Sequence, residues 1–520
     1  MEQIAIIYPN VPELAENLQS LVTPDGVERV DIVVPAAGNR AAAYQAAMDS
    51  SDARYKVYID ETIRIIDHHI LSYVLHAFQK HPDVTILGLS GASELSTPGV
   101  SVTSAKRTGC LQGPDGQELL SVGATPHVEA VEALDSWFLA TQRDVPWRSD
   151  LLHGTAFLGA SACCEHRRVH GGETSVVLVI LKTACRIAVE GFSFDKSDQN
   201  AFLDAYSREL YPLVTVCIPT YQRPAYFREA LESVLHQTYR NLDIFVTDDS
   251  ADDRTEKLIQ PYLGDGRITY EHHPEYRLVD NFEHLRTYDN PEAEYVGWLM
   301  DDDFYLPDKI SRMVEAFRTH PEVSIVTSYR MFVDGEGKPL PEERQPEVFA
   351  KEDTVYTGHS FGRITLMGIV NVVGEPSNTL LKKSFIENQR YEWIDIKPEY
   401  DCVDIPMWLN FLQKGDVYYF AQPLSCFRMH ENNEENNPTM IGGMAIGWAQ
   451  LILHAWETHA YLESEQDLAQ ALRKHLKTFL PAYFQPWFPS LPEETRRDYE
   501  KAVGKVLFTL SQISEGKPSH

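Results

Sequence analysis

The chain has 520 residues, with 46 lysines and arginines against 76 aspartates and glutamates, so its formal net charge at pH 7 is −30. So acidic a surface argues against nucleic acid as a partner, and against an anionic membrane unless a local basic patch compensates. The seven cysteines are odd in number and lack the paired spacing of zinc sites, which fits a reducing cytoplasm. We expect neither a secretory signal nor a transmembrane segment, because no apolar run is long enough to span a bilayer.

A near-repeat indicates that the chain contains a duplicated unit. Residues 77–86 (AFQKHPDVTI) return almost unchanged as residues 316–325 (AFRTHPEVSI), and an apolar strand candidate precedes each copy. The first strand candidate ends in Asp60-Glu61-Thr62, whereas the second ends in three aspartates. The first half has therefore lost most of the acidic cluster. The boundary between the halves is expected near residues 191–212, and no low-complexity linker separates them.

The second half opens with a strand–helix–strand pattern. Residues 214–218 form a buried strand candidate that a proline-rich turn breaks, and residues 227–235 then have the three-and-four spacing of a helix. Residues 242–247 read as a second strand, which ends in Asp248-Asp249-Ser250. In an open α/β sheet, ligands bind at the carboxyl ends of parallel strands. These loops are therefore candidate binding loops.

Three consecutive aspartates, Asp301-Asp302-Asp303, follow the apolar run 295–300. Adjacent carboxylates repel one another unless a cation lies among them, and oxygen ligands of this kind suit Mg²⁺ or Mn²⁺. Such a metal in turn holds a diphosphate. An isolated Asp cluster is more often an acidic turn or a helix N-cap, so the surrounding pattern decides between the two interpretations.

The last part of the chain is expected to be helical. Residues 448–456 keep a three-and-four spacing with two tryptophans, and Ser490-Leu491-Pro492-Glu493 has the form of a capping box. Such an apolar stripe is usually buried against a neighbouring domain.

From about Leu213 to His430 the chain resembles the family-two glycosyltransferases, nucleotide-sugar-dependent enzymes with the GT-A fold. The resemblance rests on motifs in the family's order, namely residues 217–221, 233–238, 248–250, Asn281, 301–309, 374–377, Asp404 with 408–409, and 427–430. It implies that one group of residues binds the nucleotide sugar: Pro219, Thr220, Tyr221, Arg223, Asp249, Asn281, Asp301 and Arg428. Within this group, Tyr221 can stack on a pyrimidine and Asp249 can accept its N3 hydrogen, which favours uracil or thymine over cytosine.

The resemblance also implies the metal ligands and the catalytic base. Asp302, Asp303 and His430 would bind Mn²⁺ or Mg²⁺, although the triplet leaves the register open by one residue. Asp404 would act as general base, taking the acceptor's hydroxyl proton during in-line attack that inverts the anomeric carbon. Asp401 competes for this role, because residues three apart share a helix face.

The first half resembles a second, GT-A-like group of bacterial glycosyltransferases through residues 134–141 and 144–148. That group carries a histidine and an aspartate where this chain has Ala156 and Gly159, and Glu165 alone is retained. We therefore expect a degenerate first half. The rival is a bifunctional enzyme in which Asp60 and Glu61 bind a second metal.

The expected fold is α/β: two tandem GT-A-like, Rossmann-like domains with mixed, mostly parallel sheets, and a C-terminal helical extension. The expected boundaries are 1–205, 206–438 and 439–520. The expected function is transfer of a sugar from a UDP- or dTDP-sugar to a bacterial surface glycan, a lipid-linked oligosaccharide or a glycoprotein, in the cytoplasm or at the inner membrane face. A non-catalytic binding subunit is the alternative. Peripheral membrane contact and homo-oligomerisation stay open.

Overall fold

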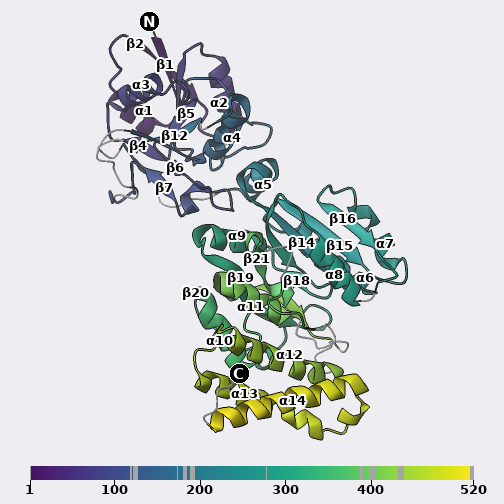
Figure 1. Ribbon diagram of the computed structural model, residues 1–520. Coiled ribbons are helices and arrows are strands. Elements are labelled where there is room, and N and C mark those ends of the chain that lie inside the picture. The colour runs from purple at the N-terminus through teal and green to yellow at the C-terminus, as the bar shows by residue number, and fades with distance from the viewer. Residues whose placement is uncertain are drawn as a thin grey trace. The chain divides into compact units, whose positions relative to one another are not determined.

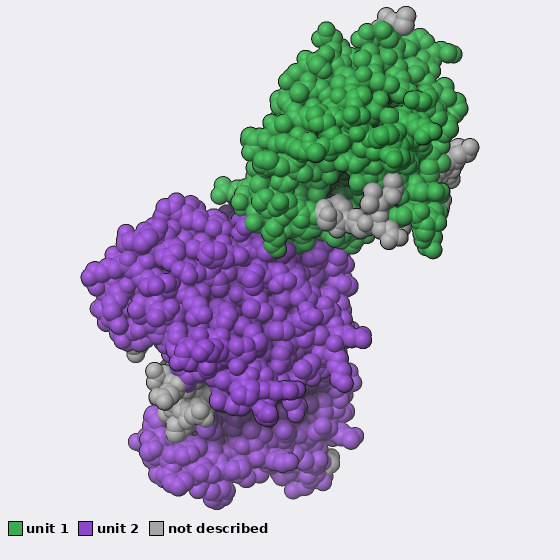
Figure 2. Space-filling view, turned by 180° about the vertical axis from the view of Figure 1, so that it is seen from behind, with its two compact units in different colours: residues 1–211 green, residues 212–520 purple. Residues whose placement is uncertain are grey.

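Two units make up the chain in the computed structural model, residues Met1–Tyr211 and Pro212–His520 (Figure 2). The structure describes residues 2–117, 120, 127–172, 174–179, 184–187, 194–276, 278–386, 391–396, 404–430 and 438–515.

The first unit is built on a seven-stranded mixed sheet (Figure 1). Its strands lie in the order β2 (Val27–Val34), β1 (Glu2–Pro9), β3 (Tyr55–Ile59), β11 (Phe138–Thr141), β5 (Ile86–Gly88), β12 (Ser175–Val179) and β9 (His127–Ala130). Two small sheets accompany it. One has the order β10 (Ala133–Leu134), β6 (Ser90–Ala92) and β7 (Arg107–Gly109), and the other has the order β4 (Ile63–Ile65), β13 (Cys185–Ile187) and β8 (Leu111–Gln112). The helices are α1 (Pro12–Gln19), α2 (Arg40–Asp49), α3 (Ile70–Lys80), α4 (Leu158–His170) and α5 (Lys196–Leu210).

The second unit is built on a nine-stranded sheet. Its order is β16 (Ile268–His272), β15 (Leu242–Asp248), β14 (Leu213–Thr220), β17 (Ala293–Trp298), β21 (Leu380–Lys382), β19 (Val323–Val333), β22 (Asp416–Arg428) and β18 (Phe304–Tyr305), with β20 (Thr354–Tyr356) on β22. The strands are connected through helices α6 (Pro224–Leu235), α7 (Arg254–Ile259), α8 (Leu278–Thr287) and α9 (Lys309–Thr319). Helix α6 begins with a proline, a residue suited to the first helical turn because a backbone N–H there would have no partner within the helix. The helix buries its predicted apolar face, Phe227, Ala230, Leu231 and Val234.

The two sheets share one topology. Six neighbouring strands of the first, β2-β1-β3-β11-β5-β12, match β15-β14-β17-β21-β19-β22 of the second in order and in relative direction. The repeated segment ends its helix alike in both: His81 and His320 donate their backbone N–H to Ala77 and Ala316, with φ of −126° and −130°. The predicted duplication and the predicted mixed α/β fold are confirmed.

A helical region follows the second sheet, as expected. Helix α12 (Pro438–Glu457) packs against α13 (Glu465–Phe479) and α14 (Glu493–Ser514), and α10 (Gly358–Gly368) packs against α11 (Asp404–Lys414) and α13. Trp448 is buried in the apolar cluster they share. In the described part of the chain, none of the helices has both the length and the apolar character that crossing a membrane needs.

The predicted capping box at residues 490–493 is wrong. Helix α14 has Pro492 at its N-cap, with no side-chain cap, and the Ser490 hydroxyl donates to the Trp487 carbonyl instead. The capping box belongs to α13, where Ser464 and Asp467 exchange side-chain and backbone hydrogen bonds. Ser464 directly precedes α13 and so can cap it, whereas Ser490 lies three residues before α14, in a turn whose Trp487 carbonyl it bonds instead.

Candidate active site

Asp301 joins the ends of two neighbouring strands in the second unit. It follows β17, and its Oδ2 accepts hydrogen bonds from the Thr220 hydroxyl (3.0 Å) and the Tyr221 backbone N–H (3.1 Å) at the end of β14. The side chain is buried, and burial, together with neighbouring Asp302, raises the pKa of Asp301 to about 7. Pro219 and Thr220 pair with the last two residues of β15, so all three strand ends open at one edge.

A second group lies at the end of β15, where a pyrimidine base was expected. Asp249 is buried, and its Oδ1 accepts from the Asn281 amide of α8 at 2.9 Å. Burial and then the charge of Asp248 raise the pKa of Asp249 to about 6. Tyr221 is 49% exposed, so its ring is accessible for stacking.

A hydrogen bond from a residue with a strained backbone joins the loop after β14 to the loop after β15. Gln222 has φ of +53°, a left-handed conformation that a residue with a Cβ adopts rarely, and its N–H donates to the Ser250 hydroxyl at 2.7 Å. The predicted base-binding residues Tyr221 and Asp249 are therefore presented by two loops that are bonded to each other.

Asp302 and His430 form the metal candidate. Asp302 Oδ2 lies 3.0 Å from His430 Nε2 and accepts from Arg223 Nη1 at 2.8 Å. The side chains of Asp302 and Arg223 are 19% and 35% exposed, so a ligand can reach both. A carboxylate oxygen and an imidazole nitrogen fit Mn²⁺ or Mg²⁺ when phosphate oxygens complete the shell. Arg223 neutralises Asp302 in this structure.

Asp303 and Arg428 are both held in contacts within the protein. The Asp303 carboxylate is buried and accepts the backbone N–H of Arg428 at 3.0 Å. The Arg428 guanidinium is itself buried: Nε donates to the Asp302 carbonyl at 2.7 Å, Nη1 to the Gly335 carbonyl at 2.9 Å, and Nη2 to Glu229. The guanidinium also lies over the rings of Tyr226 and Phe304, 4.6 Å and 5.5 Å from their centroids. These hydrogen bonds tie the triplet to residue 428, which β22 brings alongside it.

Asp404 begins α11 beside the loop 371–378. Its Oδ2 accepts from the Asn371 amide at 2.6 Å, and Asn371 also bonds the Gly374 carbonyl (3.0 Å) and N–H (2.9 Å). Burial of the carboxyl and the charge of Glu375 raise the pKa of Asp404 to about 6. The competing candidate, Asp401, lies outside the described residues.

The same loop reaches the aspartate triplet. Ser377 accepts the backbone N–H of Met300 at 3.0 Å. Burial, then Asp302, raise the pKa of Asp303, and Glu375 adds to this shift as it does for Asp404. The charge of Glu375 therefore acts on both acidic groups, and Glu375 itself pairs with Arg330 at 2.8 Å.

Sequence reasoning missed Asn371 and Arg330, and it named Glu375 only as part of a motif, without a role. The motif 374–377 pointed to this loop, but no spacing rule shows that an amide four residues before Glu375 will bond Asp404.

Among the described residues of the first unit, the two acids that follow β3 are both engaged in protein contacts. Asp60 is buried, and its Oδ1 accepts from the Thr62 N–H (2.9 Å) and hydroxyl (2.6 Å). Glu61 pairs with the buried Arg40 at 2.7 Å. Glu165 accepts from Arg148, Arg168 and the Tyr206 hydroxyl, and is likewise taken up in protein contacts.

Gly159 explains one lost acid. A Cβ at this position would fall inside van der Waals contact with the Leu134 carbonyl oxygen, because α4 lies directly on that backbone. No aspartate fits there.

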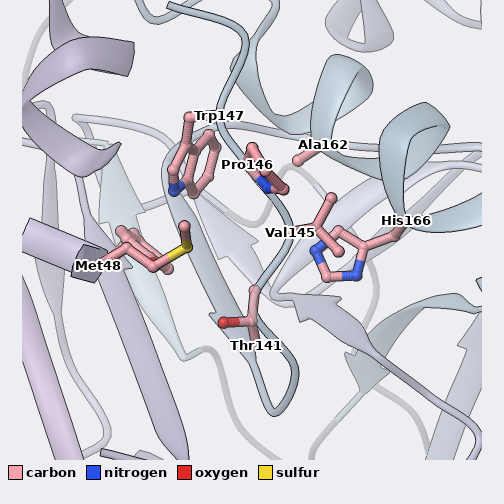
Figure 3. Close-up of a pocket in the computed structure, with 8 residues that line it drawn as sticks. Met48, Thr141, Val145, Pro146, Trp147, Ala162 and His166 are labelled. Atoms are coloured by element: carbon pink, nitrogen blue, oxygen red, sulfur yellow. The ribbon is translucent and has the colours of Figure 1, made fainter. Parts of the chain in front are cut away.

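A small closed cavity also lies in the first unit (Figure 3). Its volume is about 10 Å³, and it is lined by Met48, Tyr58, Thr141, Val145, Pro146, Trp147, Ala162 and His166. That space suits about one water molecule. Burial lowers the pKa of His166 to about 3, so the ring is neutral, and its Nδ1 is bonded to the Thr85 hydroxyl at 2.8 Å. The cavity is too small for a sugar nucleotide.

Comparison with protein families identifies both units. The family described as "Glycosyl transferase family 2" matches residues 215–388, and the family described as "Glycosyltransferase like family" matches residues 10–206. The second unit belongs to glycosyl transferase family 2. The two resemblances seen in the sequence are confirmed, and the chain is a tandem of glycosyltransferase domains.

Three bacterial relatives extend this result. An uncharacterised glycosyltransferase of Rickettsia typhi is 27% identical over 229 residues, which cover 43% of this chain and 66% of that protein. Protein CgeD of Bacillus subtilis is 34% identical over 126 residues, 23% of this chain and 30% of that protein. The GalNAc(5)-diNAcBac-PP-undecaprenol beta-1,3-glucosyltransferase of Campylobacter jejuni is 23% identical over 316 residues, 59% of this chain and 91% of that enzyme. The match thus spans less than two thirds of the length of the first two.

Among solved structures, TarS of Staphylococcus aureus is similar with a TM-score of 0.41 and 15% sequence identity, over 57% of this chain and 83% of that chain.

Proposed function

We propose that the second unit is an inverting, metal-dependent glycosyltransferase that uses a UDP- or dTDP-sugar. The observation that carries the proposal is the arrangement of its acids. Asp249 follows β15, and Asp301 and Asp302 follow β17, so the acids flank β14 at one sheet edge, and the loop 371–378 connects Asp404 to them. The family membership supplies the reaction class.

The donor's nucleotide would lie on the loops after β14 and β15. Tyr221 offers an exposed ring for stacking, and an ionised Asp249 accepts the N3 hydrogen that uracil and thymine carry. Asn281 holds the Asp249 carboxylate in place. Asp301, fixed by Thr220 and Tyr221, would face the ribose.

Asp302 and His430 would hold Mn²⁺ or Mg²⁺ against the diphosphate. When bound, such an ion neutralises the charge that develops on the departing nucleoside diphosphate. Arg223 would turn from Asp302 to the phosphates, since its side chain is partly exposed. In this proposal Asp303 and Arg428 do not touch the donor but hold the Asp302 backbone.

Asp404 would be the general base. Its pKa of about 6 leaves the carboxylate ionised at neutral pH yet more basic than a solvent-exposed aspartate, which suits proton removal from an acceptor hydroxyl. Attack from the face opposite the leaving diphosphate inverts the anomeric carbon.

The acceptor would be a glycan or glycoconjugate. The name of the Campylobacter relative specifies an undecaprenol diphosphate-linked oligosaccharide, so a lipid-linked acceptor is the first to test. The first unit, whose acids Asp60 and Glu61 are taken up by Thr62 and Arg40, would be non-catalytic and support acceptor binding or assembly.

The test is turnover of UDP- and dTDP-sugars with Mn²⁺, in wild-type protein and in Asp404→Asn. We expect a loss of about 10²- to 10⁴-fold in kcat for Asp404→Asn, because proton transfer by a positioned base contributes that much. UDP affinity, measured by calorimetry, should stay unchanged. Equal turnover by the variant would contradict the assignment of the base, and no turnover by wild-type protein with any donor of the panel would favour the non-catalytic alternative.

A further inference from the structure

Two histidines and a glutamate converge at the sheet edge of the second unit, on the β16 side. Glu271 lies in β16, His273 directly follows this strand, and His284 lies in α8. One ligand atom from each lies within 4.8 Å of the others. Both imidazoles bond the same carboxylate oxygen, Glu271 Oε2: the distance from Nε2 is 2.6 Å for His284 and 3.2 Å for His273.

The geometry suits a metal ion in place of these hydrogen bonds. The side chains are 40% (Glu271), 23% (His273) and 29% (His284) exposed, so an ion can enter from solvent. The two rings meet edge to face, with centroids 4.8 Å apart, and the Nε2 atoms of both approach the same carboxylate oxygen. Glu275 Oε1 lies 3.6 Å from Nδ1 of His273, where it can orient the ring as carboxylates behind metal-bound histidines do.

The ligand types select the metal. Two imidazole nitrogens and one carboxylate suit Zn²⁺, which binds such ligands at about 2.0–2.2 Å and keeps a fourth position for water. The Asp302–His430 pair, which relies on phosphate oxygens to complete a shell, suits Mg²⁺ or Mn²⁺ instead.

We propose that Glu271, His273 and His284 form a Zn²⁺ site, separate from the donor's metal, that fixes the loop 248–250. The ion would join the end of β16 to α8, and both elements hold this loop. The His273 N–H donates to the Asp248 carbonyl at 2.7 Å, and one helical turn before His284, Asn281 bonds Asp249. The effect on the donor's base rests on the proposed function; zinc binding and loop stiffening do not.

The first experiment measures zinc itself. Full-length protein is stripped with a chelator, and Zn²⁺ is titrated against a chromophoric competitor. We expect one tightly bound ion per chain and a loss of more than about 100-fold in affinity for His284→Gln, since removing even outer-shell partners costs about 10- to 100-fold. Glu271→Gln should behave alike, and circular dichroism checks that both variants fold.

Two controls locate the site. His320→Gln removes a histidine whose Nδ1 lies 3.4 Å from the Glu322 carboxylate, a similar pair without a third ligand, and should leave zinc binding unchanged. Asp302→Asn should also leave it unchanged. Equal zinc affinity in wild type and His284→Gln, or loss of zinc in Asp302→Asn, would overturn the proposal.

The second experiment needs no donor. Zinc should slow hydrogen exchange of the backbone amides of residues 248–250 in wild-type protein but not in His284→Gln. Exchange that is equal with and without zinc would overturn the role in fixing the loop. A failure of the proposed function would instead appear as a lack of UDP-sugar turnover, with zinc binding intact.

Discussion

Asp404 sets the pH dependence that we expect for transfer. Its pKa of about 6 predicts that kcat/KM falls as pH drops below about 6, because the base becomes protonated. Glu375→Gln removes a negative charge that raises this pKa, so the acidic limb should move to lower pH. Asn371→Ala removes the bond that stabilises the carboxylate, so the limb should move to higher pH.

Profiles of kcat/KM against pH check both shifts. Glu336→Gln, at an exposed acid of the same unit, is the matched control and should leave the profile in place. Identical profiles for all variants would show that Asp404 is not the titrating base.

Asp249 predicts a change in base preference. Asparagine in its place can donate a hydrogen bond, so Asp249→Asn should weaken UDP binding about 10-fold or more. The difference between the affinities for UDP and CDP should become smaller. Calorimetry with both nucleotides measures this, with Asp252→Asn, at a side chain 42% exposed, as control. An unchanged preference would place the base elsewhere.

Single residues also mark where sequence reasoning stops. The motifs predicted which acids lie at the strand ends, because strand order and loop position follow from local patterns. They did not predict that Asp303 faces inward, since its partner, the Arg428 N–H, lies 125 residues away and is brought there only by β22. Which way each carboxylate of a triplet points depends on such distant partners.

At the scale of elements, one ion pair joins α10 to α13. Arg363 donates to both oxygens of Asp467, which is 11% exposed and also caps α13. The pKa of Asp467 is lowered to about 2, and the hydrogen bond from Arg363 is the main cause. A depressed folded-state pKa stabilises the fold above the unfolded value of about 4 and loses that stabilisation as pH falls towards 2.

We therefore expect Asp467→Asn to lower the free energy of unfolding by about 1–2 kcal/mol at pH 7, allowing for partial exposure of Arg363. The difference should shrink as pH falls from about 4 towards 2. Urea unfolding at several pH values measures it, and Asp252→Asn, at an exposed pair, should have no effect. A difference that persists at pH 2 would point to lost capping rather than to the ion pair.

Elements were more predictable than their caps. The repeat at 77–86 and 316–325 predicted two matching helix–strand units, because apolar periodicity is a local property. The capping box failed for the opposite reason: whether Ser490 or Ser464 reaches a helix end depends on the turn that precedes it.

At the scale of the whole molecule, we predict that one unit performs the chemistry. The double variant Asp60→Asn/Glu61→Gln should retain turnover within about twofold. Both acids are engaged in contacts within the first unit, because Asp60 accepts the Thr62 N–H and Glu61 pairs with Arg40. Asp302→Asn should lose about 10²-fold or more, since it removes a ligand of the donor's metal. Sugar release from the donor panel measures both, and a comparable loss in the double variant would show that both units are active.

The close approach at Gly159 has an evolutionary consequence for the first unit. With α4 packed on the Leu134 backbone, an acid at this position is excluded by volume. A single substitution cannot introduce one, because the helix would first have to lift away. In our proposal that the first unit is non-catalytic, an acid at Gly159 could therefore be regained only by moving a whole helix, whereas the surface of the unit can change freely for other tasks.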